Sequence, residues 1–147
     1  MISYKLTNNN PTAKKGDAKE WAMCSHYGIE RSRHDSKNYM VASDLESGEK
    51  RISVKSARFT LMSGIYCEGL NTVEEIWDRY EATTHSNLAA YVTEDFEAFE
   101  MTMPEFKEFV LTFGSIQKES EKNGGGNKVR CKSESKALLK WLRSRVA

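Results

Sequence analysis

The sequence lacks several features that would place the chain in a familiar class. Its 147 residues contain no apolar run of about 18 residues, the length that a membrane-spanning helix needs, and its first residues lack the apolar stretch of a signal peptide. Only three cysteines are present, and no two of them form a CxxC pair. We therefore expect no disulfide framework and no zinc knuckle, but reduced, buried thiols in a cytoplasmic protein without a membrane partner.

Histidine-based metal motifs and a phosphate-binding loop are also missing. The three histidines show no HExxH or HNH spacing. The glycine-rich segment 123–127 is followed by no GKS or GKT, so we predict an irregular loop there and not a nucleotide site. These absences leave oxygen and nitrogen side chains elsewhere as the candidates for chemistry.

What is present suffices for one ordinary hydrophobic core. Hydrophobic residues make up 39% of the chain and aromatic residues 10%, so we predict a single domain over residues 1–147. Apolar periodicity and turn residues predict the following elements: a helix ending at Gly28, strands at 38–44 and 51–61, a helix opening with the capping box Thr72–Glu75, strands at 88–93 and 96–103, a helix from Pro104 to Gly114, a short edge strand at 128–132 and a helix at 134–146. This pattern predicts an α/β fold whose central mixed sheet is built on the 38–61 hairpin and flanked by helices.

Charge is segregated along the chain although the net charge is only +1. Residues 1–67 carry a net charge of +4, residues 68–108 carry −9 and residues 109–147 carry +6. The two basic segments can form one face for a polyanion, or they can be ordinary solvated helix faces. The residues that we predict to contact nucleic acid are Arg58, Lys128, Arg130, Lys132, Lys136 and Lys140.

Lys55 is the residue that most needs an explanation. In the strand Ile52-Ser53-Val54-Lys55, alternation places Ile52 and Val54 on one face and Ser53 and Lys55 on the other. A lysine within an apolar strand costs free energy unless it faces a polar cleft or a partner. We therefore predict that Ser53 and Lys55 face a functional cleft.

Three segments together resemble the PD-(D/E)XK nuclease superfamily, which includes restriction endonucleases and junction resolvases. Gly16–Glu20 is similar to the opening helix with its glutamate, Ser43–Glu46 to the strand with its aspartate, and Ser53–Ser56 to the strand with its lysine. Ser53 stands where the superfamily usually has an acidic residue. Asp35 competes with Asp44 for the aspartate position, but Asp44 is preferred because nine residues, and not eighteen, separate it from Ser53.

The resemblance implies a restriction endonuclease-like fold and a Mg²⁺-dependent DNA endonuclease, of the restriction, resolvase or phage and mobile-element type, with Mn²⁺ as a possible substitute. Asp44, Glu20 and the Val54 carbonyl would bind the metal, with Asp35 as a further candidate. Lys55 would orient or deprotonate the attacking water, and Ser53 would help to position metal or water. A homodimer is also implied.

Two other interpretations stay open. The first is a catalytically silent nucleic-acid-binding module of the same fold, because Ser53 supplies only a neutral oxygen. The second is a phage-type interaction or inhibitor protein whose acidic middle segment meets a basic partner.

Overall fold

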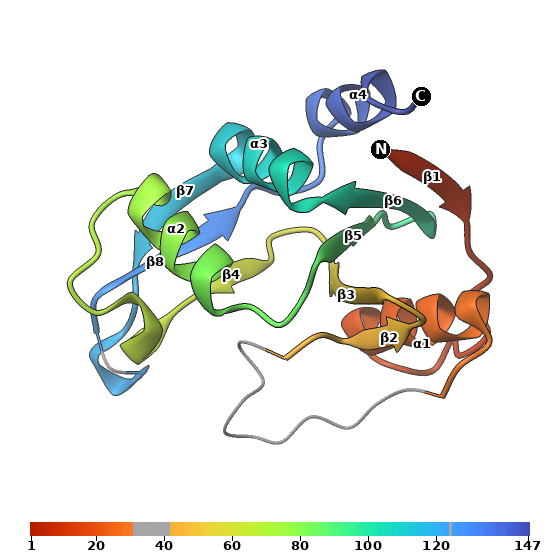
Figure 1. Cartoon of the computed structure of the whole chain (residues 1–147), viewed down its shortest axis with the longest axis horizontal. Helices are drawn as coiled ribbons and strands as arrows, with labels where there is room; N and C mark the ends of the chain where they lie inside the picture. The colour runs from red at the N-terminus through yellow and green to blue at the C-terminus, as the bar shows by residue number, and fades with distance from the viewer. Residues whose placement is uncertain (31–41, 124) are drawn as a thin grey trace.

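The computed structural model describes residues 1–30, 42–123 and 125–147 and shows a mixed α/β fold (Figure 1). Its elements, in chain order, are β1 (Ile2–Lys5), α1 (Lys15–Tyr27), β2 (Leu45–Ser47), β3 (Lys50–Lys55), β4 (Thr60–Met62), the 3-10 helix η1 (Gly64–Cys67), α2 (Val73–Thr83), β5 (Leu88–Val92), β6 (Glu97–Thr102), α3 (Met103–Phe113), β7 (Gly114–Lys118), the 3-10 helix η2 (Glu121–Asn123), β8 (Asn127–Cys131) and α4 (Lys136–Ser144).

Five strands form the larger sheet, in the order β1-β6-β5-β3-β2. β3 and β5 are parallel, and the other neighbouring pairs are antiparallel, so the prediction of a mixed sheet is confirmed. The chain passes from β3 to β5 through β4 and α2, as a parallel pair requires a long crossover. The β2–β3 hairpin occupies one edge of this sheet, and β5 is its middle strand.

A second sheet has the order β4-β8-β7 and is antiparallel throughout. β8 coincides closely with the strand predicted at 128–132, but the prediction of an edge position was wrong. β7 lies on one side of β8 and β4 on the other. The sequence pattern did not identify β7 or a separate β4, so β8 could not be recognised as the middle strand.

The 38–61 hairpin exists but differs from its predicted limits. Residues 38–41 lie outside the described residues, and 42–44 precede the first strand, which begins at Leu45. The second strand was predicted to continue to Leu61, whereas β3 ends at Lys55 and residues 60–62 join the other sheet. Arg58 has a positive φ of 60° in the intervening turn. Periodicity did not reveal this turn because apolar residues stand on both sides of it.

The two faces of the larger sheet pack into two hydrophobic clusters. The smaller cluster includes Ala22, Met23 and Cys24 of α1 together with Leu45 and Ile52 of the hairpin. The larger cluster lies on the opposite face and joins α2, α3 and α4 to both sheets; its buried members include Tyr91, Phe99, Phe106, Phe109, Val129, Cys67 and Cys131. All three cysteines are free and buried, as predicted.

The predicted helix limits are confirmed at the positions where local chemistry fixes them. Gly28 ends α1 in the left-handed conformation with φ 67°, and the Thr72 side chain accepts a hydrogen bond from the Glu75 N–H at the start of α2. Gly114 is needed between α3 and β7, because a Cβ atom there would lie 2.6 Å from the Val110 carbonyl oxygen. In the part of the chain that the structure describes, no helix has the length and apolar character needed to cross a membrane.

Candidate active site and basic cavity

Lys55 and Ser53 lie on the same face of β3, as alternation predicts. Their partners on β5 are Tyr91 and Ala89, which belong to the larger hydrophobic cluster, whereas Ile52 belongs to the smaller cluster on the other face. Ser53 is buried, and Lys55 is partly exposed with its Nζ 5.7 Å from the centroid of the Phe59 ring. Within the described residues, no carboxylate lies within ion-pair distance of Lys55 Nζ.

Asp44 is held against β3 by two hydrogen bonds. Its backbone N–H donates to the Ile52 carbonyl at 2.9 Å, and its Oδ2 accepts from the Val54 N–H at 2.6 Å. The pairing of Leu45 with Ile52 places Asp44 opposite Ser53. The Asp44 carboxylate thus accepts the hydrogen bond that a neighbouring strand would otherwise accept from Val54. Val54 directly precedes Lys55 in the chain.

The Val54 carbonyl points to the same edge of β3 as the Asp44 carboxylate. In a strand, the N–H and C=O of one residue point to the same side, and the Val54 N–H bonds Asp44. The pairing of β2 with β3 ends at Ile52 on this side, so among the described residues no strand covers the edge at Val54. The predicted carboxylate and carbonyl ligands therefore do lie together.

Glu20 belongs to α1, which packs on the face of the larger sheet that contains the smaller cluster. Tyr27 of the same helix lies over the start of β3, because its hydroxyl is 3.2 Å from Lys50 Nζ. At the other end of α1, Lys19 Nζ contacts Glu94 Oε1 at 3.1 Å, just beyond the end of β5. Because β5 is parallel to β3, α1 runs antiparallel to β3.

Glu20 lies on the α1 side of the sheet. It shares a helix side with Cys24, which packs in the cluster that contains Leu45 and Ile52. Glu20 is therefore on the face of the sheet opposite the Lys55 side chain, which lies on the side of the larger cluster.

The oxygen donors of this edge fit a hard divalent cation. Mg²⁺ prefers carboxylate and carbonyl oxygens and keeps several waters, so it does not need a complete protein cage. Among the described residues, no group of three His, Cys, Asp or Glu side chains is placed to hold a metal ion. The predicted set has two carboxylates among the described residues, Asp44 and Glu20; Asp44 lies beside Val54, and Asp35 lies outside the described residues.

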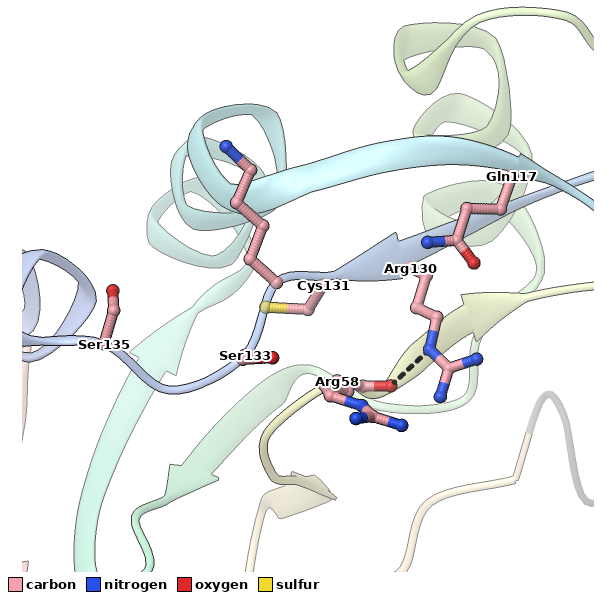
Figure 2. Close-up of a pocket in the computed structure, with 7 residues that line it drawn as sticks. Arg58, Gln117, Arg130, Cys131, Ser133 and Ser135 are labelled. Carbon is pink, nitrogen blue, oxygen red and sulfur yellow. Dashed lines mark hydrogen bonds between the residues drawn. The ribbon is translucent and has the colours of Figure 1, made fainter.

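Three of the six predicted nucleic-acid-binding residues meet in one cavity. Arg58, Arg130 and Lys132 line a cavity of about 610 Å³ beside the second sheet, together with Gln117, Cys131, Ser133 and Ser135. Figure 2 shows Arg130 reaching toward Arg58, with Gln117 beside Arg130 and Ser135 farther along the chain toward α4. Arg58, one of the lining residues of the cavity, follows Lys55 by three positions in the chain.

The other three predicted residues lie elsewhere. Lys128 is ion-paired with Glu119 at 3.3 Å and is largely covered. Lys136 and Lys140 line a second cavity of about 450 Å³ along α4, together with Leu139, Arg143 and Ser144. The predicted basic face is therefore divided, and of these two cavities the one at Arg58 is nearer in sequence to the end of β3.

Sequence reasoning missed a buried polar network on the α1 side of the larger sheet. Glu100 of β6 accepts hydrogen bonds from the Tyr4 hydroxyl at 2.7 Å, the Tyr27 hydroxyl at 2.5 Å and Lys50 Nζ at 2.8 Å. The His26 ring stacks on Tyr4 with centroids 4.1 Å apart. A glutamate within the apolar strand 96–103 was the available signal, by the same reasoning that identified Lys55.

The charges in this network stabilise one another. Burial works to raise the pKa of Glu100, but the hydrogen bonds from Lys50, Tyr27 and Tyr4 outweigh it and leave that pKa below its usual value. The hydrogen bond to Glu100 in turn raises the pKa of Lys50. Because the Glu100 carboxylate already accepts three hydrogen bonds, the network ties β1, α1 and β3 to β6 and does not offer an open metal site.

Comparison with known proteins gave no match: no family model fits the chain, and no curated protein or solved structure is significantly similar to it.

Proposed function

We propose that the protein is a Mg²⁺-dependent DNA endonuclease with its active site at the edge of β3. The observation that carries this proposal is the 2.6 Å hydrogen bond from the Val54 N–H to Asp44 Oδ2. It holds the aspartate beside Val54, the residue that precedes Lys55 in the chain, and this supports the grouping that the sequence resemblance implies. The succession of α1, the β2–β3 hairpin, α2 and the parallel strand β5 is compatible with a restriction endonuclease-like fold.

Each residue has a defined task in this proposal. Asp44, Glu20 and the Val54 carbonyl would hold the cation, which supplies an activated water and neutralises charge on the attacked phosphate. Lys55 would orient that water or take its proton, and Ser53 would position it. The water oxygen adds to phosphorus, one P–O ester bond breaks, and the leaving oxygen takes a proton from solvent. Pairing of two chains to cut both strands is part of the proposal.

A second candidate function is supported by Ser53. Its side chain is only 5% exposed and offers a neutral hydroxyl where a carboxylate would add charge to the cation site. A protein with this residue can retain the DNA-binding surface while it lacks cleavage. The candidate is then a nucleic-acid-binding module with the same fold.

Cleavage of supercoiled and branched DNA by purified protein, in Mg²⁺, Mn²⁺ or EDTA, separates the two functions. The critical variant is Asp44→Asn, because its amide oxygen can still accept the hydrogen bond from the Val54 N–H while the charge is lost. Glu46→Gln is the matched control, since Glu46 lies on the same hairpin and its carboxylate contacts Ser43 and His85.

The endonuclease proposal predicts cleavage that needs the metal, is lost in Asp44→Asn and persists in Glu46→Gln. Cleavage by Asp44→Asn at the wild-type rate would refute the assignment of this site. Wild-type protein that binds DNA without cutting it, and that gains cleavage on Ser53→Asp, would establish the binding module instead.

A further inference from the structure

Among the described residues, the lining of the cavity at Arg58, Arg130 and Lys132 has three cationic side chains and no acidic one. Its remaining lining residues, Gln117, Ser133, Ser135 and Cys131, are uncharged. Its volume of about 610 Å³ lies within the range of roughly 300–1,000 Å³ that is usual for ligand sites. A concentration of one charge in a recess attracts ions of the opposite sign.

The backbone holds these three residues together. The Arg58 N–H donates to the Lys132 carbonyl at 3.4 Å, and Arg130 Nε donates to the Arg58 carbonyl at 3.2 Å (Figure 2). Arg58 itself adopts a positive φ of 60°, which is unfavourable for a residue with a side chain. The chain therefore accepts local strain at the turn that directs Arg58 into the cavity, and such strain is concentrated at functional sites.

Three cations of the C-terminal segment have carboxylate partners among the described residues. The paired residues are Lys128 with Glu119 at 3.3 Å, Arg143 with Glu97 at 3.3 Å and Arg145 with Glu108 at 2.6 Å. Across residues 1–30, 42–123 and 125–147, no carboxylate lies within ion-pair distance of Arg58, Arg130 or Lys132. Three adjacent unpaired cations repel one another, and a bound anion would remove that repulsion.

We propose that this cavity binds a backbone phosphate of double-stranded DNA without reading the bases. The inference rests on the proposed function for its substrate. Guanidinium groups match phosphate oxygens in a two-pronged geometry, and Gln117 and the serine hydroxyls add neutral donors. Single-stranded nucleic acids are usually bound by stacking of bases on aromatic rings, and none of the described residues that line the cavity is aromatic. Phe59, next to Arg58, packs with Phe106 and Phe109.

The cavity also lies at a defined distance from the candidate active site. Lys55 and Arg58 are three residues apart, so their Cα atoms are separated by at most about 10 Å. Successive phosphates of one strand advance about 3.4 Å along the duplex axis. The bound phosphate would therefore lie near the bond that is cut, and the cavity would position the strand for cleavage.

Binding to a short DNA duplex, measured by fluorescence anisotropy over a range of salt concentrations in EDTA, tests the inference. The variants are Arg58→Gly, which keeps the positive φ without strain, and Lys132→Gln at an exposed position. Arg145→Gln is the control of equal charge change outside the cavity. Thermal melting of each variant confirms that it is folded.

Each cavity variant is expected to reduce the slope of log K against log salt by up to about 0.9, the value for complete loss of the one phosphate contact. The reduction should be the same for two duplexes of unrelated sequence, and Arg145→Gln should keep the wild-type slope. The inference is overturned if both cavity variants keep that slope, if the loss occurs only with single-stranded DNA, or if a mononucleotide displaces the duplex from wild-type protein but not from the variants.

The binding assay and the cleavage assay test the two proposals separately. Cleavage that depends on Asp44, with a salt slope indifferent to Arg58 and Lys132, would overturn the cavity and leave the endonuclease intact. A slope that depends on the cavity, with no cleavage in Mg²⁺ or Mn²⁺, would refute the endonuclease and leave the phosphate site.

Discussion

The Tyr27 hydroxyl and the Glu100 carboxylate share a 2.5 Å hydrogen bond although 73 positions separate them in the chain. This bond joins the end of α1 to the second strand from the edge of the larger sheet. Lys50 donates to the same carboxylate and to the Tyr27 hydroxyl, so the start of β3 is held at the same point. The layer that carries Glu20 is thereby fixed relative to the strand that carries Lys55.

Replacing the Glu100 carboxylate should weaken the fold measurably. In Glu100→Gln the amide offers one acceptor for three donors, which leaves polar groups unsatisfied in a buried site. We expect the free energy of unfolding to fall by about 1–3 kcal/mol, as measured by chemical denaturation. Glu97→Gln on the same strand is the control: its ion pair with Arg143 is partly exposed, and its loss should cost less than about 1 kcal/mol. Equal losses of unfolding free energy in the two variants would show that the buried network stabilises the fold no more than an exposed ion pair does.

The same network predicts a sensitivity to acid. The folded-state pKa of Glu100 is lowered, so its contribution is fully present above the unfolded pKa of about 4.3 and is lost as the pH falls through the folded value. The stability difference between wild type and Glu100→Gln should therefore be constant near neutral pH and shrink below about pH 4. Denaturation curves from pH 3 to pH 7 measure it, and a difference that grows toward low pH would contradict the prediction.

Arg58 provides a test of backbone strain that does not depend on DNA. Its φ of 60° is accepted readily by glycine, so Arg58→Gly should raise the free energy of unfolding by up to about 1 kcal/mol. The adjacent Ala57→Gly should act in the opposite direction, by about 0.5–1 kcal/mol, because glycine there only increases the freedom of the unfolded chain. Thermal unfolding of the two variants under one set of conditions gives the comparison, and a destabilised Arg58→Gly would show that the guanidinium contributes more than the turn costs.

The active-site proposal predicts an order among variants of β3. Lys55→Ala removes a group in contact with the attacking water and should slow cleavage by about 10²-fold or more. Ser53→Ala removes one hydrogen bond, worth about 1 kcal/mol, and should slow cleavage about fivefold. Single-turnover cleavage of a labelled duplex measures both rates. A Lys55→Ala protein that cuts as fast as wild type would exclude the lysine from catalysis.

Local chemistry explains which elements the sequence could predict. The end of α1 at Gly28 and the start of α2 at Thr72 follow from residues that act on their immediate neighbours, and α3, predicted from Pro104, begins one residue earlier at Met103. The division of residues 51–61 into β3 and β4 was missed because it depends on a single turn between apolar stretches. The position of β8 was missed because a middle strand is defined by distant partners, here residues 60–62 and 114–118.

The candidate site was predicted in a similar way. Asp44, Val54 and Lys55 could be grouped from sequence because a hairpin brings close residues together. The meeting of Arg58 with Arg130 and Lys132 could not be predicted, because it depends on the pairing of β4 with β8 across some 70 residues. Net charge indicated a basic surface but not which cations remain without carboxylate partners.

The three buried cysteines make the two layers of the core separately observable. Cys24 reports on the cluster beneath α1, while Cys67 and Cys131 report on the larger cluster. Burial raises the pKa of Cys67 to about 11 and that of Cys131 to about 12, so both thiols react slowly with alkylating reagents in the native protein. Alkylation in mild denaturant, followed by mass spectrometry, would then show which cysteine becomes reactive first. It would tell whether the layer that carries Glu20 opens before the layer beside the cavity at Arg58.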